Sequence, residues 1–368
     1  MKIQAAIAFE GKEHYEIHEC DLTEPGPDEV LVDVKACGVC HTDASVKSGA
    51  LPMPLPNILG HEGAGIVKKT GANVSHVKAG DHVVMTYGSC GSCSSCSAGQ
   101  PPYCLEFAER NLLLPEPSGP PTHKLDGTPI NGRFFSQSSF ATHAIAQKTN
   151  TIKIDREIPF HLAGPMACGV QTGMGAVLNT LQPTAGQSIA IFGAGSVGLS
   201  AVMAAKIANC GEIIAIDINP TRLALAAELG ATHTINSSEL DPLAAIGEAV
   251  PSMMNYAFDS TAVPKVAELA IMSLARKGVA GFVGAPPLGT GFNVDMNLLV
   301  GFGITLRGVV EGDSIPSLFI PQMIDYYKRG QLPLDKIITT YPFAKINDAV
   351  EAAEGGRVVK AVLMMDDA

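Results

Sequence analysis

Four cysteines in one short Gly/Ser-rich stretch of this chain could bind a metal ion. Cys90, Cys93 and Cys96 follow one another at three-residue spacing, and Cys104 comes eight residues later. Four thiolates are the number that a closed, tetrahedral structural zinc site requires. The stretch offers few apolar neighbours beside which a thiol could be buried. The spacing therefore predicts a structural zinc site rather than four unrelated core cysteines.

A glycine-rich segment predicts a nucleotide site. Residues 193–198 read Gly-Ala-Gly-Ser-Val-Gly, a GxGxxG sequence that is weak alone because glycine turns are common. Its context strengthens it, since a β-rich run precedes it and an Ala-rich helical pattern follows, whose first N–H groups could hold a pyrophosphate. Asp217 ends the next apolar run, where a carboxylate can accept hydrogen bonds from a ribose and repel a 2′-phosphate. We therefore expect NAD rather than NADP as the cofactor. Arg222 leaves NADP as an alternative, or could itself bind the adenosine ribose.

Three dispersed residues could form a second metal site. Cys40 follows an apolar run, His61 precedes Glu62, and Cys168 precedes a glycine. Two thiolates and an imidazole leave the fourth position of a zinc ion open, as a catalytic site requires. Taken singly, each residue could equally be a buried cysteine or a core histidine. Their occurrence together with the nucleotide segment and the four-cysteine loop favours the metal site.

The elements that position these residues change in character along the chain. Up to about residue 150, short alternating runs such as 29–36 and 81–85 predict a β-rich region. Strand-like and helix-like runs then alternate, which predicts a parallel sheet with crossover helices; they are residues 188–195, 196–209, 212–218 and 220–230. A helical run over 315–330 and a strand-like run over 359–365 do not extend this alternation, and we read them as a return to the first domain.

Composition limits the classes of function. A chain of 368 residues with 46% hydrophobic and 17% charged residues is long enough for two globular domains. Its net charge of −11 argues against nucleic acid or an anionic membrane as partner, and favours a small molecule. Charged residues interrupt the N-terminal apolar run, so we expect no signal peptide and a cytoplasmic protein. Nine cysteines, an odd number, fit metal binding better than disulfides.

Together these motifs resemble those of the zinc-dependent medium-chain alcohol dehydrogenases. The similarity rests, in that family's order, on residues 38–43, 60–62, 90–104, 168–169 and 193–198, and runs from about residue 27 to the C-terminus. Residues 134–141, 164–165 and 171–173 are most similar to benzyl alcohol (aryl-alcohol) dehydrogenases. Dehydrogenases of allylic terpene alcohols such as geraniol or perillyl alcohol are the alternative. The resemblance implies reversible oxidation of a primary alcohol to its aldehyde, with NAD and two Zn²⁺ per chain.

The resemblance also implies an α/β fold. A GroES-like β-rich catalytic domain with both zinc sites would comprise residues 1–169 and 313–368. A Rossmann NAD-binding domain with a doubly wound parallel sheet would comprise residues 170–312. A homodimer or homotetramer built on the Rossmann domain is implied as well.

Residue roles follow from the same resemblance. Cys40, His61 and Cys168 become catalytic zinc ligands, Glu62 a neighbouring or transient ligand, and Asp43 the carboxylate that orients His61. Thr42 becomes the hydroxyl that receives the substrate proton. Phe134 and Phe135 would line the alcohol pocket, with core packing as the alternative. The expected cofactor contacts are His41, Thr172, Gly193, Gly195, Ser196, Val197, Gly198, Asp217, Arg222, Val283 and Lys360.

Two of these residues would face the cofactor pyrophosphate, namely His41 and Lys360. For His41, a solvated surface histidine is the alternative, because a neutral imidazole gives little to a phosphate. One position departs from the family: many relatives have a histidine three residues after the relay hydroxyl, where this chain has Ser45. A serine is no base near neutral pH, so the relay would end on water or on another group, with His41 as a competing candidate.

Two other classes of protein share parts of this pattern. A zinc-free quinone or enone reductase on the same fold would need neither Cys40 nor Cys168. A non-enzymatic, zinc-stabilised nucleotide-binding protein would keep the four-cysteine loop and lose the open site. Zinc content distinguishes the three classes. The dehydrogenase should bind about two zinc ions per chain, the reductase none and the binding protein one.

Overall fold

The chain divides into two compact units in this computed structural model, which describes residues 1–112 and 120–365. The first unit comprises Met1–Cys168, Ile315–Tyr327 and Leu334–Ala368, and the second comprises Gly169–Ser314 and Lys328–Pro333. The sequence-based boundaries lie within one or two residues of these at 169 and 313. They differ at residues 328–333, which the sequence assigned to the first domain. This short segment packs with the second unit, and no feature of its composition indicates that.

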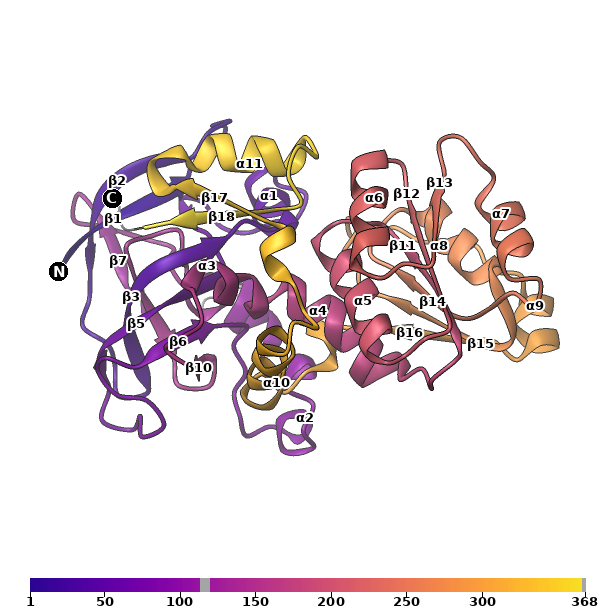
Figure 1. The fold of residues 1–368 in the computed structure, drawn as a ribbon. Coiled ribbons are helices and arrows are strands. Elements are labelled where there is room, and N and C mark those ends of the chain that lie inside the picture. Colours follow the sequence, from indigo (N-terminus) through magenta and orange to yellow (C-terminus); the bar gives the residue numbers. More distant parts are fainter. Residues whose placement is uncertain (113–119, 366–368) are drawn as a thin grey trace. The chain divides into compact units, whose positions relative to one another are not determined.

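Two β-sheets form the first unit (Figure 1). One has the order β4-β1-β2-β7-β8, with β1 (Lys2–Ala8), β2 (Glu16–Leu22), β4 (Asn57–Ile58), β7 (His123–Leu125) and β8 (Thr128–Ile130). The other has the order β10-β6-β5-β3-β18-β17, and β9 also pairs with β3. Its strands are β3 (Glu29–Gly38), β5 (Glu62–Thr70), β6 (His82–Met85), β9 (His143–Gln147), β10 (Thr151–Lys153), β17 (Ile338–Pro342) and β18 (Lys360–Met364).

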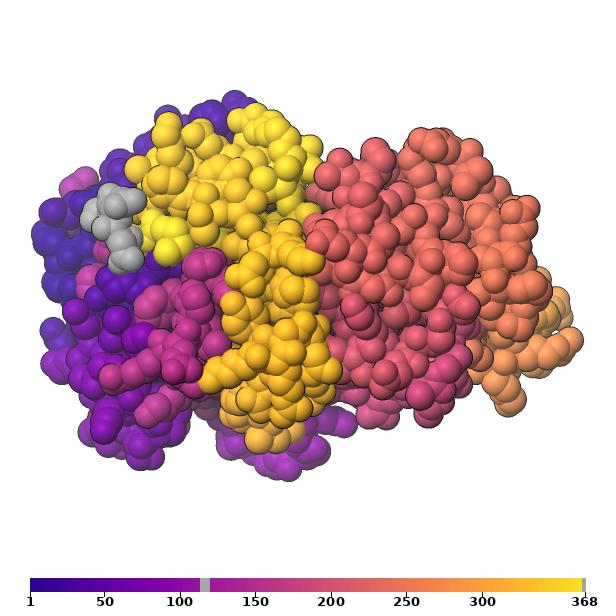
Figure 2. Space-filling model, in the orientation of Figure 1, coloured from indigo at the N-terminus to yellow at the C-terminus, as the bar shows by residue number. Residues whose placement is uncertain are grey.

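Strand β3 lies at the centre of the second sheet because its alternating sequence buries one apolar face. Val30, Val32 and Val34 are at most 1% exposed and belong to the main apolar core of this unit. Strand β3 pairs antiparallel with β5, β9 and β18. The pairing with β18 confirms that the C-terminal segment returns to the first unit, and Figure 2 shows that segment, in yellow, against the indigo N-terminal residues.

Short helices connect these strands and carry several of the candidate site residues. They are α1 (His41–Lys47), α2 (Ser94–Ser97), α3 (Phe160–Ala163) and α11 (Ile346–Glu354), and α10 (Pro316–Lys328) follows the last strand of the second unit.

The second unit is a Rossmann fold, as expected. Its six parallel strands have the order β13-β12-β11-β14-β15-β16, which reverses beside β11, the position where such sheets bind ligands. They are β11 (Ser188–Phe192), β12 (Glu212–Asp217), β13 (His233–Asn236), β14 (Met254–Asp259), β15 (Leu274–Phe282) and β16 (Thr305–Gly308). Strand β11 is buried along its whole length, which explains its continuous apolar sequence.

Helices cover this parallel sheet. They are α5 (Ser196–Ile207), α6 (Pro220–Leu229), α7 (Pro242–Ala249), α8 (Pro264–Met272) and α9 (Met296–Phe302), and α4 (Gly169–Gly175) packs against α5. Figure 1 shows α5 and α6 on one side of the sheet and α7, α8 and α9 towards the other. The sequence predicted the long apolar elements; β13, β16, α7 and α9 are short or partly exposed and carry weaker patterns. In the described part of the chain, no helix has the length and apolar content to cross a membrane.

Candidate active site and metal centres

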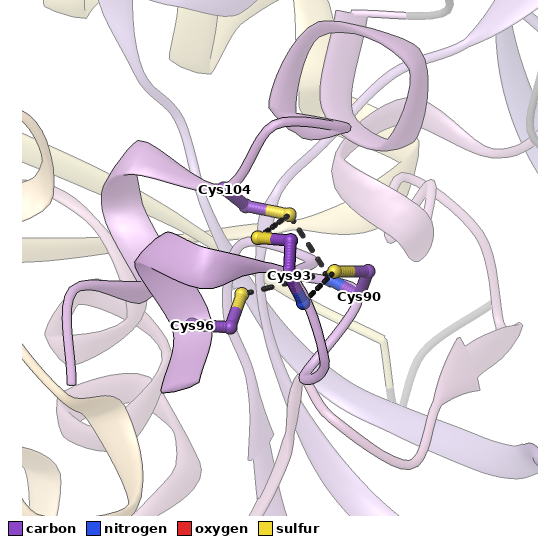
Figure 3. A group of neighbouring side chains, drawn as sticks. All are labelled: Cys90, Cys93, Cys96 and Cys104. Atoms are coloured by element: carbon purple, nitrogen blue, oxygen red, sulfur yellow. Dashed lines mark hydrogen bonds between the residues drawn. The ribbon is translucent and has the colours of Figure 1, made fainter. Parts of the chain in front are cut away.

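The four cysteines of the predicted structural site converge on one point. Cys90, Cys93, Cys96 and Cys104 have sulfur atoms within 4.8 Å of one another, and Figure 3 shows the thiols turned towards a common centre. The Sγ atoms of Cys90 and Cys96 are 3.9 Å apart, and those of Cys93 and Cys104 are 4.0 Å apart. Sulfurs around a tetrahedral zinc at about 2.3 Å would be about 3.8 Å apart. This group therefore fits a closed zinc site.

Backbone amides of the loop stabilise negative charge on these sulfurs. The N–H groups of Ser92 and Cys93 donate to Cys90 Sγ at 3.5 and 3.3 Å, and Cys90 N–H donates to Cys104 Sγ at 3.2 Å. Backbone hydrogen bonds lower the pKa of Cys90 and Cys93, the latter to about 6, whereas burial raises the pKa of Cys96 and Cys104. The loop therefore favours the thiolate form at Cys90 and Cys93, the form in which cysteine binds zinc, whereas Cys96 and Cys104 would have to lose a proton when a metal binds.

The dispersed residues also come together. Cys40, His61, Glu62 and Cys168 each offer a ligand atom, and these atoms lie within 4.8 Å of one another. Cys40 lies directly before α1, His61 precedes β5, and Cys168 lies directly before α4. A hydrogen bond from Cys168 and the nearby His61 lower the pKa of Cys40 well below its usual range, although burial opposes this. The surroundings therefore favour a Cys40 thiolate.

Asp43 orients the imidazole of His61, as the resemblance implied. Asp43 Oδ1 lies 3.1 Å from His61 Nδ1 and accepts from Gly60 N–H at 2.9 Å, and Oδ2 accepts from Cys40 N–H at 3.0 Å. Burial lowers the pKa of His61, but the charges of Asp43 and Cys40 outweigh it and raise that pKa well above its usual value. The surroundings of His61 thus favour positive charge, which a metal cation supplies.

The second ring nitrogen of His61 shows that a metal ion fits the group of Cys40, His61 and Cys168. With Nδ1 held by Asp43, Nε2 is the ring nitrogen left for a metal; it is buried and has no hydrogen-bond partner among the described residues. An unsatisfied buried polar atom costs about 1–3 kcal/mol. A cation bound by His61 Nε2 and the two thiolates removes that cost, and two thiolates with an imidazole are the ligand set of open zinc sites.

Glu62 forms a buried ion pair behind these ligands. Its carboxylate lies 2.6 Å from Lys360 Nζ, which also donates to Val39 O at 3.0 Å, and Lys360 is 3% exposed. Burial raises the pKa of Glu62 to about 7, although Lys360 opposes the shift. The described contacts of Lys360 therefore lie inside the metal centre and give no support to its expected contact with a pyrophosphate.

The other expected residues of this unit lie near the same centre. Thr42 is half-buried, with Oγ1 3.7 Å from Cys40 Sγ, whereas His41 is exposed. Ser45 follows Thr42 by three residues on α1, so the two lie on one side of the helix. Phe134 and Phe135 are buried and pack on His61, edge-on with ring centroids 5.3 Å apart and stacked at 4.4 Å, respectively.

The glycine-rich loop of the second unit links β11 to α5. Gly193 has φ of 92°, and a Cβ on Gly198 would lie 1.7 Å from the Gly193 carbonyl oxygen, so both positions require glycine. A Cβ on Gly195 would meet no described atom within 4 Å, and Ser196 Oγ is buried without a hydrogen-bond partner. The open space at the start of α5 fits a phosphate group, which this helix end would bind through its N–H groups.

Asp217 lies at the carboxyl end of β12 beside that loop. Its Oδ2 accepts from Ala194 N–H at 2.6 Å, and its Oδ1 accepts from Asn219 N–H at 2.8 Å. Each carboxylate oxygen retains a second lone pair for a ribose hydroxyl. Arg222 Nε is buried and has no partner among the described residues. Two further expected cofactor residues, Thr172 and Val283, are half-buried in this unit.

Both units of the chain match families of known proteins. Residues 26–156 match the model of the alcohol dehydrogenase GroES-like domain, and residues 196–328 match that of the zinc-binding dehydrogenases. The chain is 39% identical to a geraniol dehydrogenase of Castellaniella defragrans, over 98% of this chain and 97% of that protein. This chain belongs to the zinc-dependent medium-chain alcohol dehydrogenases.

Solved structures agree with that membership. A zinc-binding-domain alcohol dehydrogenase protein from Burkholderia ambifaria is 46% identical to this dehydrogenase, with a TM-score of 0.97 and 99% coverage of each chain. The benzyl alcohol dehydrogenase of Acinetobacter calcoaceticus is 42% identical, with a TM-score of 0.94 and the same coverage. The GroES-like and Rossmann folds expected from the sequence are therefore confirmed.

The sequence did not reveal every residue at the metal centre of this dehydrogenase. The Glu62–Lys360 pair joins residues 298 positions apart, which no local pattern can indicate. Gln137, a fully buried amide that bonds to the His61 carbonyl, was also missed. It lies within the segment that carried the similarity to aryl-alcohol dehydrogenases, yet only its contacts reveal a role.

We expect the two cysteine groups to respond differently to mutation. Cys93→Ala should remove the loop zinc and lower the free energy of unfolding by at least several kcal/mol, because structural zinc contributes about 10–16 kcal/mol in zinc-finger peptides. Cys168→Ala should leave a folded protein that binds NAD without turning over. Thermal unfolding, zinc content and NAD binding check this, with Cys210→Ala, outside both groups, as control. Equal loss of stability in both variants would show that the structural and open sites have been confused.

Proposed function

We propose that this dehydrogenase oxidises a primary aromatic alcohol of the benzyl type to its aldehyde with NAD, reversibly, and binds two zinc ions per chain. The observation that carries this proposal is the convergence of Cys40, His61 and Cys168 around a buried imidazole nitrogen that has no hydrogen-bond partner in the described part of the chain. A zinc-free reductase has no need of that group. A binding protein would need only the four-cysteine loop.

The residues of the open centre have separate roles in this reaction. Cys40, His61 and Cys168 would hold a zinc ion, which would supply Lewis-acid polarisation of an alcohol oxygen, and bound NAD would supply the hydride acceptor. Asp43 fixes the His61 ring through Nδ1. Thr42, two residues beyond Cys40 and half-buried, offers the hydroxyl that accepts the substrate proton.

Allylic terpene alcohols are the second candidate substrates. The Castellaniella relative is named a geraniol dehydrogenase and the Acinetobacter structure a benzyl alcohol dehydrogenase, at similar identities to this chain. Phe134 and Phe135 are buried in the apolar core and pack on His61, and a flat aryl group bound beside His61 would extend this aromatic cluster in offset or edge-to-face geometry. We therefore place the aryl alcohols first.

Assembly through the second unit is part of the proposal. Two apolar side chains of α9, Met296 and Val300, lie one helical turn apart and are 75% and 80% exposed, and Leu288 in the preceding loop is 86% exposed. Grouped exposed apolar residues are typical of protein–protein interfaces. They support a homodimer or homotetramer built on the Rossmann unit.

For the cofactor, we predict that Asp217→Gly weakens NAD binding about 10- to 100-fold and NADP binding much less. The carboxylate provides a charged hydrogen-bond acceptor worth about 1.5–3 kcal/mol to a ribose hydroxyl and repels a 2′-phosphate. Both Kd values should be measured, because Asp217 also binds the Ala194 amide and its loss loosens the loop for either cofactor. Asp241→Gly, which removes only the α7 N-cap, is the control. An unchanged ratio of the two Kd values would contradict the assignment of Asp217 as the residue that selects NAD.

For the substrate, benzyl alcohol should exceed ethanol in kcat/KM by about 5- to 150-fold. Two aromatic contacts of about 0.5–1.5 kcal/mol each give that range. A steady-state screen of benzyl alcohol, geraniol, perillyl alcohol and ethanol with saturating NAD checks it. Geraniol turning over better than benzyl alcohol would move the assignment to terpene alcohols. Efficient ethanol oxidation with poor benzyl alcohol turnover would refute the aryl proposal while leaving the family intact.

For the proton path, Ser45→His should raise alcohol oxidation at pH 6–7 more than at pH 9. The wild-type chain has no base at this position, and general-base catalysis typically contributes 10²–10⁴-fold, so a gain of up to about 10²-fold at low pH is expected. Thr42→Ala should abolish the gain, because it removes the hydroxyl between the alcohol and the new base.

The competing account assigns the terminal base to His41, one turn earlier on α1. In that case Ser45→His would change little, and His41→Gln would depress the rate at pH 6–7. The pH–rate profiles of both variants decide between the two proton paths.

A further inference from the structure

The loop over residues 134–139 has a strained backbone beside the open metal centre. Phe135, Ser136 and Ser138 have φ of 49°, 55° and 52°, values that disfavour any residue with a Cβ. Such conformations persist only where the surrounding structure imposes them, and they gather at functional sites. The loop contacts His61 through both of its phenylalanine rings, at centroid distances of 5.3 and 4.4 Å.

Gln137 is the polar residue that anchors this loop. Its side chain is fully buried, and Nε2 lies within hydrogen-bonding distance of three carbonyl oxygens, those of His61 at 2.9 Å and of Met85 and Thr86 at 3.0 Å. Its Oε1 accepts from Gly63 N–H at 3.1 Å. A buried amide satisfied in this way is costly to replace, because the carbonyl of His61 and the amide of Gly63 would lose the hydrogen bonds that it makes to them, while the Thr86 carbonyl would keep its bond from Asn150.

These hydrogen bonds hold the backbone on both sides of Glu62. The carbonyl of His61 lies before it and the amide of Gly63 after it, so the Gln137 carboxamide fixes the start of β5. The packing here is tight, since a Cβ on Gly63 would lie 2.3 Å from Ser139 Oγ. The position of the imidazole thus depends on the amide as well as on Asp43.

A second branch leads from the same amide to Cys168. Gln137 contacts the Thr86 carbonyl, and the Thr86 hydroxyl donates to the carbonyl of Ala167 at 2.6 Å. Ala167 directly precedes Cys168 in the chain. One buried side chain is therefore connected to the backbone of two metal ligands that are 107 positions apart in sequence.

We infer that Gln137 is a positioning residue of the open metal centre. It sets the backbone of His61 directly and that of Cys168 through Thr86, so the donor atoms are in place before an ion binds. The inference rests on the zinc site proposed above. Partners behind metal ligands commonly alter metal affinity 10- to 100-fold, which is the effect expected here.

The test is the Gln137→Met variant of the full chain, which keeps the side-chain length and removes both polar atoms. Zinc affinity of each site is measured by competition with a chelator, and the open site is also loaded with Co²⁺ for its visible spectrum. We expect the open-site affinity to fall 10- to 100-fold and the cobalt spectrum to change, with the four-cysteine site unaffected.

Asn347→Leu is the matched control. Its amide also bridges backbone groups of this unit, accepting from Tyr15 N–H at 2.8 Å and donating to Tyr15 O at 3.0 Å, and neither partner is a predicted metal ligand. We expect this variant to lose stability without a change in zinc affinity or in the cobalt spectrum.

The possible outcomes separate this inference from the proposed function. A wild-type chain that binds no second zinc overturns the proposed function and this inference with it. Two zinc ions in the wild type, with unchanged open-site affinity and cobalt spectrum in Gln137→Met, overturn the inference alone and leave Gln137 a structural residue.

Should Gln137→Met fail to fold, the milder Thr86→Val decides. It removes only the hydroxyl that binds the Ala167 carbonyl, and it should lower open-site zinc affinity several-fold. Unchanged affinity in a folded Thr86→Val protein overturns the inferred connection to Cys168.

Discussion

The buried Nε2 atom of His61 needs a partner that no described side chain provides. Asp43 holds the opposite ring nitrogen, Phe135 covers one face of the ring, and Cys40 and Cys168 bring their sulfur atoms to the same point. In an apolar interior these polar atoms are costly unless they are satisfied. A metal ion is the ligand that satisfies an imidazole nitrogen and two thiolates together, and the surrounding elements are arranged to present them to it.

A different constraint shapes the second unit. A phosphate can approach the first turn of α5 only if the preceding loop is narrow and carries no side chain in the way. Gly193 and Gly198 make that turn possible, and the empty space at Gly195 provides the approach. Asp217 then holds the loop through the Ala194 amide, so the residue expected to select the cofactor also shapes its binding loop.

Sequence reasoning succeeded where a signal is local. The three-residue spacing of Cys90, Cys93 and Cys96 forces their thiols together, and the apolar runs of β11 and β12 are the buried strands of the parallel sheet. The open centre is different, because its ligands come from three separate parts of the chain. Composition alone favoured buried core residues there, and only the order of several motifs made the metal site the better prediction.

Other features could not be predicted because they exist only after folding. No local sequence pattern indicates that Glu62 pairs with Lys360. The serines and phenylalanines of residues 134–139 likewise do not reveal that the backbone has positive φ angles or that Gln137 bonds to His61. The direction of the Phe134 and Phe135 rings is likewise a product of packing. The sequence assigned them to the alcohol pocket with core packing as the alternative, and the structure shows both rings buried in the apolar core and in contact with His61.

The central claim is that one chain holds zinc in two different ligand sets. Zinc content of the purified chain, combined with X-ray absorption at the zinc edge, tests it most directly. One site has four sulfur ligands, and the other has two sulfurs and one imidazole. The account therefore predicts about two zinc ions per chain. Averaged over both sites, each zinc should have about three sulfur ligands, and a shell of nitrogen or oxygen ligands should also be seen. One zinc per chain with four sulfur ligands and no lighter shell would contradict the account.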